Sequence, residues 1–476
     1  MRKFWAVLAA VLASGGALAA DAVKKDQSIL DRLYANTGVY HRPATAHTPN
    51  FVSDPGWPAP LPHSWLLGQI GGLYVDQNDH IWVYNRPRTM TTDEAGLEVR
   101  GGGNGKNGQG FARPNGPVAD CCNAAPSVLE FDTAGKLLKA WGGPADPGWL
   151  ESHCKAADGC IWPNSEHGIY VDHKGNVWLA GNGARGNPDS SWTTHAEGAD
   201  GFVLKFDQNG NFKMRIGGTP TGPASNDTSG GINGTPLLYL PADMVVDPKT
   251  NRLYLADWDG RVWALDARTG RTIWRRKPAR AAIKGALALS DGRLYVGAYD
   301  GHLYCLGAQK GRLIWKAKAQ SRLYGHTRFY STPAVAYGRV YIGGTDGKVY
   351  SFGATSGKIR WSHGTGGYVY ASPAIWRNTV LVGSYSKRLF ALDAATGDVK
   401  WTHRVSAPIS GSATVIGNIV YFATLGKKTK GRTYALNART GKLVWSYPDG
   451  KYTPAVAEKG RLFLIGYARV YGMVPK

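Results

Sequence analysis

Four oxygen-bearing side chains have the chemistry needed for metal-assisted proton transfer. Glu166 and Asp227 carry carboxylates, and Asn164 and Asn182 carry amides. Oxygens of both kinds suit a hard cation such as Ca²⁺, which takes about six to eight of them. We expect Glu166, Asn164 and Asn182 as metal ligands, and Glu166 and Asp227 as candidates for the base that accepts a substrate proton. Ordinary connecting loops are also rich in these residue types.

Four of the five cysteines lie close to these residues. Cys154 and Cys160 are six residues apart and are expected to form a small-loop disulfide if the protein is exported. Cys121 and Cys122 are adjacent, so they either form a strained ring with each other or cross-link to the first pair. Cys305 is expected to be a buried free thiol.

Four more residues are candidates for ligand or cofactor binding. Arg86 and Arg88 either bind a carboxylate or phosphate group by paired hydrogen bonds or cap loop carbonyls. Trp162 offers an aromatic surface four residues before Glu166. His167 stands where a strand begins, so it is either a zinc ligand or a histidine satisfied by its surroundings. The two corresponding positions hold Ile70 and Pro241, which does not support a three-histidine zinc site.

A repeated unit in the second half of the chain indicates the kind of fold that positions these side chains. From residue 260 onward five copies recur, such as GRVWALDARTGRTIW, each ending in a tryptophan. The tryptophans are Trp274, Trp315, Trp361, Trp401 and Trp445, at steps of 41, 46, 40 and 44 residues. Alternating strands and Gly-containing turns within each step predict four strands, which is one propeller blade.

These copies resemble the pyrroloquinoline-quinone (PQQ) type repeat, with its A-x-D-x-x-T-G-x-x-x-W motif. Ala264, Gly270 and Trp274 match it, whereas Cys305 and Ser351 replace the alanine in two copies. The resemblance implies that the tryptophans dock neighbouring blades. It also implies either a PQQ-dependent alcohol dehydrogenase-like oxidoreductase with Ca²⁺ or a non-catalytic binding propeller. In quinoprotein alcohol dehydrogenases a ring disulfide stacks on the cofactor, so Cys121 and Cys122 are either such a platform or a structural staple.

The first half carries a different unit. GGLYVDQNDHIWV (71 to 83) and HGIYVDHKGNVWL (167 to 179) read as paired inner strands, and VLEFDTAGKLLKAWGG (128 to 143) reads as paired outer strands. This pattern looks like the NHL type of blade over residues 62 to 258. Some NHL-like lyases place a zinc ligand at the position of His167, which is the basis for the zinc alternative.

Together these repeats predict an all-β fold, a single eight-bladed propeller. Its tail supplies three strands of the last blade, and we expect residues 63–70 to supply the fourth and close the ring. Seven blades with the tail packed outside is the alternative. The expected domains are a signal peptide (1–19), an N-terminal strap (20–61) with a short helix near residues 28–33, and a propeller (62–476).

Long insertions point to one face of this ring. Residues 84–126 and 181–201 follow second strands, and residues 144–165 and 219–239 join successive blades. Strand alternation sends both kinds of connection to the face where the channel opens, so the four insertions form a canopy there. Because long loops on a rigid scaffold are usually functional, we expect a small ligand or cofactor to bind at this face.

Charge and targeting signals limit the partners. Residues 1–239 hold 19 Lys and Arg against 22 Asp and Glu, whereas residues 240–476 hold 37 against 12. The start of the chain resembles a cleaved export signal without a lipid-anchor cysteine, so we expect a periplasmic or secreted protein that does not bind nucleic acid. One basic cluster is either a solvated loop or, with Arg322, His326 and Arg328, a site for an anionic cofactor or polymer; its members are Lys427, Lys428, Lys430 and Arg432. A CxxCH motif is absent from the sequence, which excludes a covalently attached c-type haem.

Overall fold

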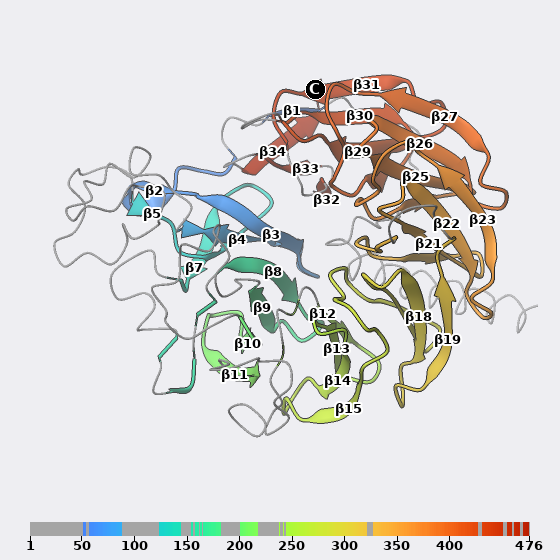
Figure 1. The fold of residues 1–476 in the computed structure, drawn as a ribbon. Coiled ribbons are helices and arrows are strands. Elements are labelled where there is room, and N and C mark those ends of the chain that lie inside the picture. The colour runs from blue at the N-terminus through green and yellow to red at the C-terminus, as the bar shows by residue number, and fades with distance from the viewer. Residues whose placement is uncertain are drawn as a thin grey trace, which may run out of the picture.

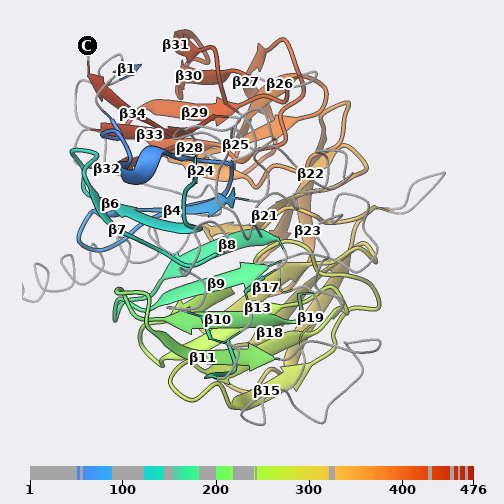
Figure 2. The same ribbon diagram turned by 90° about the vertical axis from the view of Figure 1, so that its left-hand side faces the viewer.

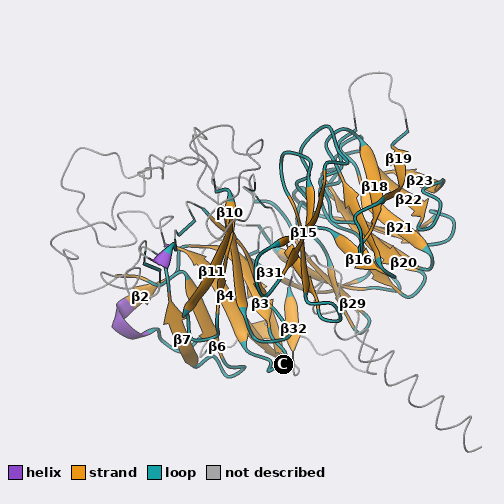
Figure 3. Ribbon diagram, turned by 90° about the horizontal axis from the view of Figure 1, so that it is seen from below, coloured by secondary structure: helices purple, strands orange, loops and turns teal. Residues whose placement is uncertain are grey.

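Short strands joined by Asp- and Gly-containing turns form nearly all of the regular structure, as the repeat pattern predicts (Figure 3). The computed structural model describes residues 51–53, 57–87, 123–143, 154–155, 158–160, 162–163, 165–181, 200–217, 238, 241, 244–320, 327–426, 431–450, 455–458, 461–466 and 470–475. A single turn of 3-10 helix, η2 (Pro62–Ser64), precedes the first blade. None of the helices in these ranges is long and apolar enough to cross a membrane.

Seven blades are each built from strands that follow one another along the chain, and each is a four-stranded antiparallel sheet. The first three blades contain β3 (Gln69–Val75), β4 (Ile81–Arg86), β6 (Val128–Phe131) and β7 (Leu137–Trp141); β8 (Glu166–Val171), β9 (Val177–Gly181), β10 (Phe202–Phe206) and β11 (Phe212–Gly217); and β12 (Met244–Asp247), β13 (Arg252–Ala256), β14 (Val262–Asp266) and β15 (Thr272–Arg276). Figure 2 shows β8 to β11 side by side in this order.

The next four blades follow the same order. They contain β16 (Ala288–Ser290), β17 (Arg293–Gly297), β18 (His302–Gly307) and β19 (Leu313–Lys318); β20 (Ala334–Ala336), β21 (Arg339–Gly343), β22 (Lys348–Gly353) and β23 (Ile359–Gly364); β24 (Ala374–Trp376), β25 (Thr379–Ser384), β26 (Arg388–Asp393) and β27 (Val399–Arg404); and β28 (Thr414–Ile416), β29 (Ile419–Ala423), β30 (Thr433–Asn437) and β31 (Leu443–Tyr447). Figure 1 shows the blades succeeding one another around the ring in chain order.

An eighth four-stranded sheet closes the ring. It pairs β32 (Val456–Glu458), β33 (Arg461–Ile465) and β34 (Val470–Pro475) with β1 (Phe51–Ser53), and β3 contacts β32 across the junction (Figure 1). The eight-bladed fold with an N-terminal closing strand is therefore confirmed.

The prediction that residues 63–70 supply this strand is wrong. Trp65–Leu66 instead forms β2, which pairs in parallel with β5 (Asn123–Ala124), and Gln69 begins β3. Trp57 explains the difference, because its ring packs on Phe131 and Phe463 and thereby anchors the chain at the seam between the first and last blades. β1 comes from the segment predicted as the strap, and residues 20–50 of that segment lie outside the described residues.

Strand alternation gives the ring two different faces. We call the face with the hairpins between first and second and between third and fourth strands the turn face. The opposite face, with the connections between second and third strands and between blades, is the loop face. On the turn face, aspartates fold the hairpins: Asp172 Oδ1 accepts hydrogen bonds from the backbone N–H groups of Lys174 and Asn176, each at 2.9 Å. Asp172 Oδ2 accepts one from Trp178 Nε1 at 2.9 Å.

Docking tryptophans join the blades of the second half, as the PQQ-type resemblance implies. Trp361 Nε1 donates to the carbonyl oxygen of Ala394 in the next blade at 3.0 Å. The ring lies against Gly397, where φ is +81° and where a Cβ would stand 2.7 Å from the ring. Trp274, Trp315 and Trp401 make the same hydrogen bond to the following blade.

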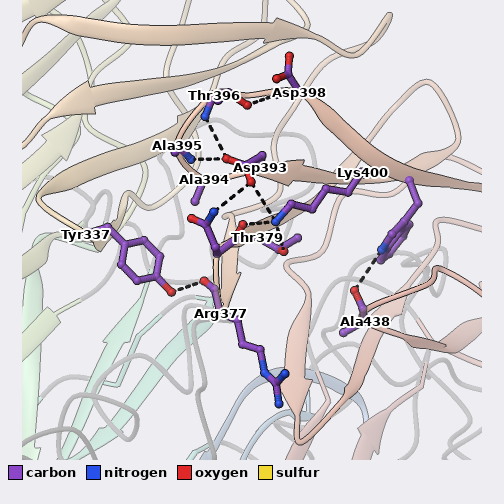
Figure 4. A network of polar contacts seen from close by, with 12 residues as sticks. Tyr337, Arg377, Thr379, Asp393, Ala394, Ala395, Thr396, Asp398, Lys400 and Ala438 are labelled. Carbon is purple, nitrogen blue, oxygen red and sulfur yellow. Dashed lines mark hydrogen bonds and ion pairs between the residues drawn. The ribbon is translucent and has the colours of Figure 1, made fainter.

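A polar network on the turn face joins the same blades (Figure 4). Asp393 accepts hydrogen bonds from the backbone of Ala395 and Thr396 and pairs with Lys400 Nζ at 3.1 Å. Burial alone would raise the pKa of Asp393, but the hydrogen bonds from Lys400 and the backbone outweigh it and hold the pKa below its usual value. The labelled groups either stabilise a turn or, like Tyr337 with Arg377, join neighbouring blades, so we assign the network a structural role.

Candidate functional site

Glu166 begins β8 at the loop face, and the surrounding structure encloses its carboxylate. The side chain is only 2% exposed. Its Oε1 accepts hydrogen bonds from Ser127 Oγ and from Trp162 Nε1, both at 3.1 Å. The free-energy cost of burying this carboxylate is reduced, because the two hydrogen-bond donors on one oxygen replace the water that it loses.

Arg86 lies beside Glu166 but approaches its backbone. Its Nε donates to the Glu166 carbonyl oxygen at 2.5 Å. Burial lowers the pKa of the Arg86 guanidinium, and the nearby Glu166 carboxylate opposes that shift. Both inner strands are bulged here, between Ile70 and Gly72 in β3 and between Glu166 and Gly168 in β8. Gly71 permits this close approach, because a Cβ there would stand 2.5 Å from the Glu166 oxygen.

Trp162 belongs to the core between blades one and two. It is 4% exposed, and its ring packs near Tyr84 and Phe206. Cys154 and Cys160 form the predicted disulfide and are buried in the same core. The disulfide therefore fixes the short loop that precedes Trp162. The free, buried state of Cys305 is also confirmed, and burial raises the pKa of its thiol to about 12.

His167 is partly exposed at the start of β8, where its carbonyl oxygen packs close to Gly72. Among the described residues, His167 takes part in no group of three His, Cys, Asp or Glu side chains close enough to hold a metal. The neighbouring Ser165 donates its backbone N–H to the buried Asp200 at 3.2 Å, which ties the entry of β8 to the entry of β10 in the same blade.

The structure thus brings Glu166, Trp162, Arg86 and His167 together at one edge of the loop face. The remaining predicted site residues, Asp227, Cys121, Cys122, Arg88, Asn164 and Asn182, lie outside the described residues. Their roles stay predictions, as does the pairing of Cys121 and Cys122.

The calcium-assisted quinone centre stays a prediction, because Asn164, Asn182 and Asp227 lie outside the described residues. Such a centre needs several oxygen ligands that converge on one point beside the cofactor. Glu166 Oε1 instead points at two hydrogen-bond donors inside the core between the blades, and Arg86 serves a backbone carbonyl. These contacts give the residues a clear structural role, and no catalytic step follows from them.

A second group of residues lies on the loop face, and of these only Arg328 was a candidate from the sequence. Aromatic side chains from blades three to six form a continuous line, which we call the aromatic arc. Its members are Trp258, Tyr299, Tyr330, Tyr368, Tyr370 and Tyr385. Ring centroids of Tyr330 and Tyr370 are 5.3 Å apart, and those of Tyr370 and Tyr385 are 5.0 Å apart. Tyr330 is 40% exposed and Tyr368 is 50% exposed, so the arc faces solvent.

Two cations lie in the arc. Lys284 Nζ is 3.5 Å from the centroid of the Trp258 ring and 5.0 Å from that of Tyr299. Arg328 Cζ lies 5.5 Å from the Tyr299 centroid. Neither makes an ion pair with a carboxylate of the described residues. Burial lowers the pKa of Lys284, and repulsion from Arg328 lowers it further.

The inner strands hold the arc in register. The backbone N–H of Ala286 donates to Thr332 Oγ1, that of Thr332 to Ser372 Oγ, and that of Ser372 to Ser412 Oγ, at 2.9 to 3.1 Å. Each bond links one blade to the next, just below the arc. The sequence contains a signal for this: Tyr330 and Tyr370 both stand two residues before a Ser or Thr that precedes proline, in YSTP and YASP.

Comparisons with known proteins agree with the fold of the second half. Residues 258–374 and 365–462 match a protein family described as outer membrane protein assembly factor BamB. This stretch carries PQQ-type propeller repeats. A comparison with curated proteins finds no match. The NHL-type resemblance of the first half stays a prediction.

Two examples represent the solved structures that are similar to this chain. BamB from Moraxella catarrhalis has a TM-score of 0.47 and 16% identity, over 64% of this chain and 81% of that chain. A quinohemoprotein alcohol dehydrogenase from Pseudomonas putida HK5 has a TM-score of 0.39 and 17% identity, over 45% of this chain and 49% of that one. The similarity thus covers about half the length of the dehydrogenase.

Proposed function

We propose that this protein is a non-catalytic binding propeller of the periplasm or the extracellular space, and that its aromatic arc holds an acidic segment of a partner protein. The observation that carries the proposal is the position of Lys284 and Arg328 among exposed tyrosines on the loop face. Tyrosine, tryptophan and arginine are the residues that contribute most binding energy at protein interfaces.

Charge favours an acidic partner. The acidic residues beside the arc are already engaged: Asp259 pairs with Arg261 and with Lys277, and Asp300 accepts hydrogen bonds from Tyr304 and the backbone of Arg280. The two cations of the arc therefore remain available to a carboxylate. The excess of Lys and Arg in residues 240–476 adds long-range attraction that salt would screen.

The family match favours a binding scaffold rather than an enzyme. Its description names an assembly factor, and the matched residues include the whole arc. The contacts of Glu166 and Arg86 provide no separate support for quinone chemistry. An export-type leader and the disulfide support a location outside the cytoplasm.

Site-specific photo-crosslinking tests the proposal. A photoreactive phenylalanine analogue replaces Tyr330 or Tyr368 in the arc, or Tyr337 as the control. Tyr337 is also exposed, at 59%, but lies in a hairpin on the turn face. We expect both arc positions to crosslink the same partner protein in intact cells and Tyr337 not to do so. Lys284→Glu combined with Arg328→Glu should reduce that crosslink at least tenfold and leave the thermal unfolding temperature near that of the parent.

Three outcomes would overturn the proposal. One is the absence of a discrete protein adduct from either arc position. Another is a crosslink to polysaccharide, which would assign the arc to an anionic polymer. The third is dye-linked alcohol oxidation by the purified protein after addition of PQQ and Ca²⁺, with activity lost in Glu166→Gln.

A further inference from the structure

We propose that Asp76, His80 and Glu130 form a binding site for a divalent metal ion on the turn face of blade one, and that Zn²⁺ fits it. Among the described residues this is the one group of three His, Cys, Asp or Glu side chains whose ligand atoms come together, all within 4.8 Å of one another. It lies on the turn face, whereas Glu166 begins β8 of blade two on the loop face, so it is separate from the predicted canopy site and from the aromatic arc.

Two hairpin residues and one strand residue build the cluster. Asp76 follows β3, and His80 precedes β4 after a tight turn in which Asp79 has a φ of +65°. Glu130 lies in β6, where it pairs with Trp82 of β4. His80 Nδ1 is 2.7 Å from Glu130 Oε1 and 4.0 Å from Asp76 Oδ2. Three ligand atoms therefore come together from one hairpin and one neighbouring strand.

Spare ligand capacity remains on both carboxylates. Asp76 Oδ1 accepts the backbone N–H groups of Asn78 and His80, but Oδ2 accepts only Trp82 Nε1 among the described residues. Glu130 is 2% exposed, and within the described part of the chain its Oε2 accepts no hydrogen bond but has Lys139 Nζ as an ion-pair partner at 3.1 Å. A buried carboxylate in this state is stabilised by a nearby cation.

Metal binding requires only small shifts. Zinc ligands stand about 2.0 to 2.2 Å from the metal, so tetrahedral ligand atoms lie roughly 3.3 Å apart. The observed separations of 2.7 and 4.0 Å lie on either side of that value. Lys139 is 34% exposed on the outer strand and can turn into solvent when the metal takes its place beside Glu130. His80 is 33% exposed, which provides an entry path and an open coordination position for water.

Blade two shows that the hairpin does not need these ligands. Its aspartate, Asp172, makes the same backbone and tryptophan hydrogen bonds as Asp76. The position of His80 is occupied by Asn176, whose Nδ2 donates to both Asp172 oxygens. The position of Glu130 is occupied by Lys205, which pairs with Trp178 across the sheet. The hairpin geometry therefore does not depend on a histidine and a glutamate at these positions, and together the two residues of blade one supply what a metal needs.

Isothermal titration of the metal-free full chain with Zn²⁺ tests the site, with Mg²⁺ as the comparison because an imidazole ligand disfavours it. We expect one Zn²⁺ per chain and no Mg²⁺ binding in the same concentration range. His80→Asn copies the residue of blade two and should fold normally, yet weaken Zn²⁺ binding at least tenfold. Glu130→Gln should do the same. His302→Asn is the matched control, since His302 faces a single carboxylate, Asp300, at 3.4 Å.

X-ray absorption of the zinc-loaded parent provides a readout that does not depend on the variants. The expected first shell contains one imidazole nitrogen and carboxylate oxygens at about 2.0 to 2.2 Å. The proposal is overturned if the parent binds no Zn²⁺, if His80→Asn binds as tightly as the parent, or if the first shell lacks imidazole. In those cases His80, Glu130 and Lys139 are an ion-pair network only.

Discussion

Substituting Gly397 by alanine should lower the free energy of unfolding for two reasons, a strained backbone and a steric clash with the docked Trp361 ring. Gly397 has a φ of +81°, and its missing Cβ would stand 2.7 Å from Cδ2 and 2.8 Å from Cε3 of Trp361. The left-handed backbone costs an alanine about 1–2 kcal/mol. Because Trp361 is 8% exposed and hydrogen-bonded to Ala394, the ring cannot retreat freely, and overpacking adds about 1–3 kcal/mol. The expected loss of stability is thus about 2–5 kcal/mol.

Gly338 is the matched control. Its φ is +66°, and a Cβ there meets nothing within 4 Å, so Gly338→Ala should show only the backbone cost of about 1–2 kcal/mol. Urea unfolding followed by circular dichroism and tryptophan fluorescence measures both variants. A double-mutant cycle with Trp361→Ala then isolates the steric cost, because Gly397→Ala should lose its excess destabilisation once the ring is gone. The docking argument would be refuted if Gly397→Ala and Gly338→Ala lowered stability equally. It would also be refuted if the additional loss caused by Gly397→Ala were the same in the Trp361→Ala background.

Two other features give simple tests. Burial raises the pKa of Asp257 to about 6, against hydrogen bonds from Trp263 and Arg261 that lower it, so the native state binds this proton more readily than the unfolded chain. Its contribution to the free energy of unfolding should therefore grow as the pH falls from about 6 toward 4. Urea titrations at pH 7, 6, 5 and 4 should show this slope relative to Asp257→Asn, and parallel curves would contradict it. Replacing Cys154 and Cys160 together by serine should lower stability by about 2 kcal/mol, given the short loop. Reductant should then destabilise the parent and Cys305→Ser more than the double variant, as thermal unfolding with and without reductant would show.

The repeats explain why the fold could be predicted. Every blade repeats the same period-two strands and aspartate or glycine turns, so local sequence determines each sheet. Trp274 and its equivalents mark each outer strand, and Cys154 with Cys160 are close enough in sequence for a disulfide to be inferred. The closing strand could not be inferred in the same way. Its position depends on Trp57, which packs against residues of both the first and the last blade.

For the predicted site, the sequence did not reveal the environment of Glu166. Glu166 has the chemistry of a metal ligand or base, but its chemical role depends on what surrounds it. Ser127 and Trp162 approach it from separate connections, and their two hydrogen bonds place the carboxylate in a core. Residue type alone could not distinguish this buried, satisfied state from an exposed one.

The sequence by itself determined the ring of PQQ-type blades in the second half, the uneven distribution of charge and the nearby disulfide, because each depends on residue type and short spacing. Only the tertiary structure decided which side chains meet. Tyr330 and Tyr370 are 40 residues apart and touch because successive blades place equivalent connections side by side. Glu130 reaches His80 across 50 residues because the register of β4 and β6 aligns Trp82 with it. Contacts of this kind arise from ring closure and strand register, which no local pattern encodes.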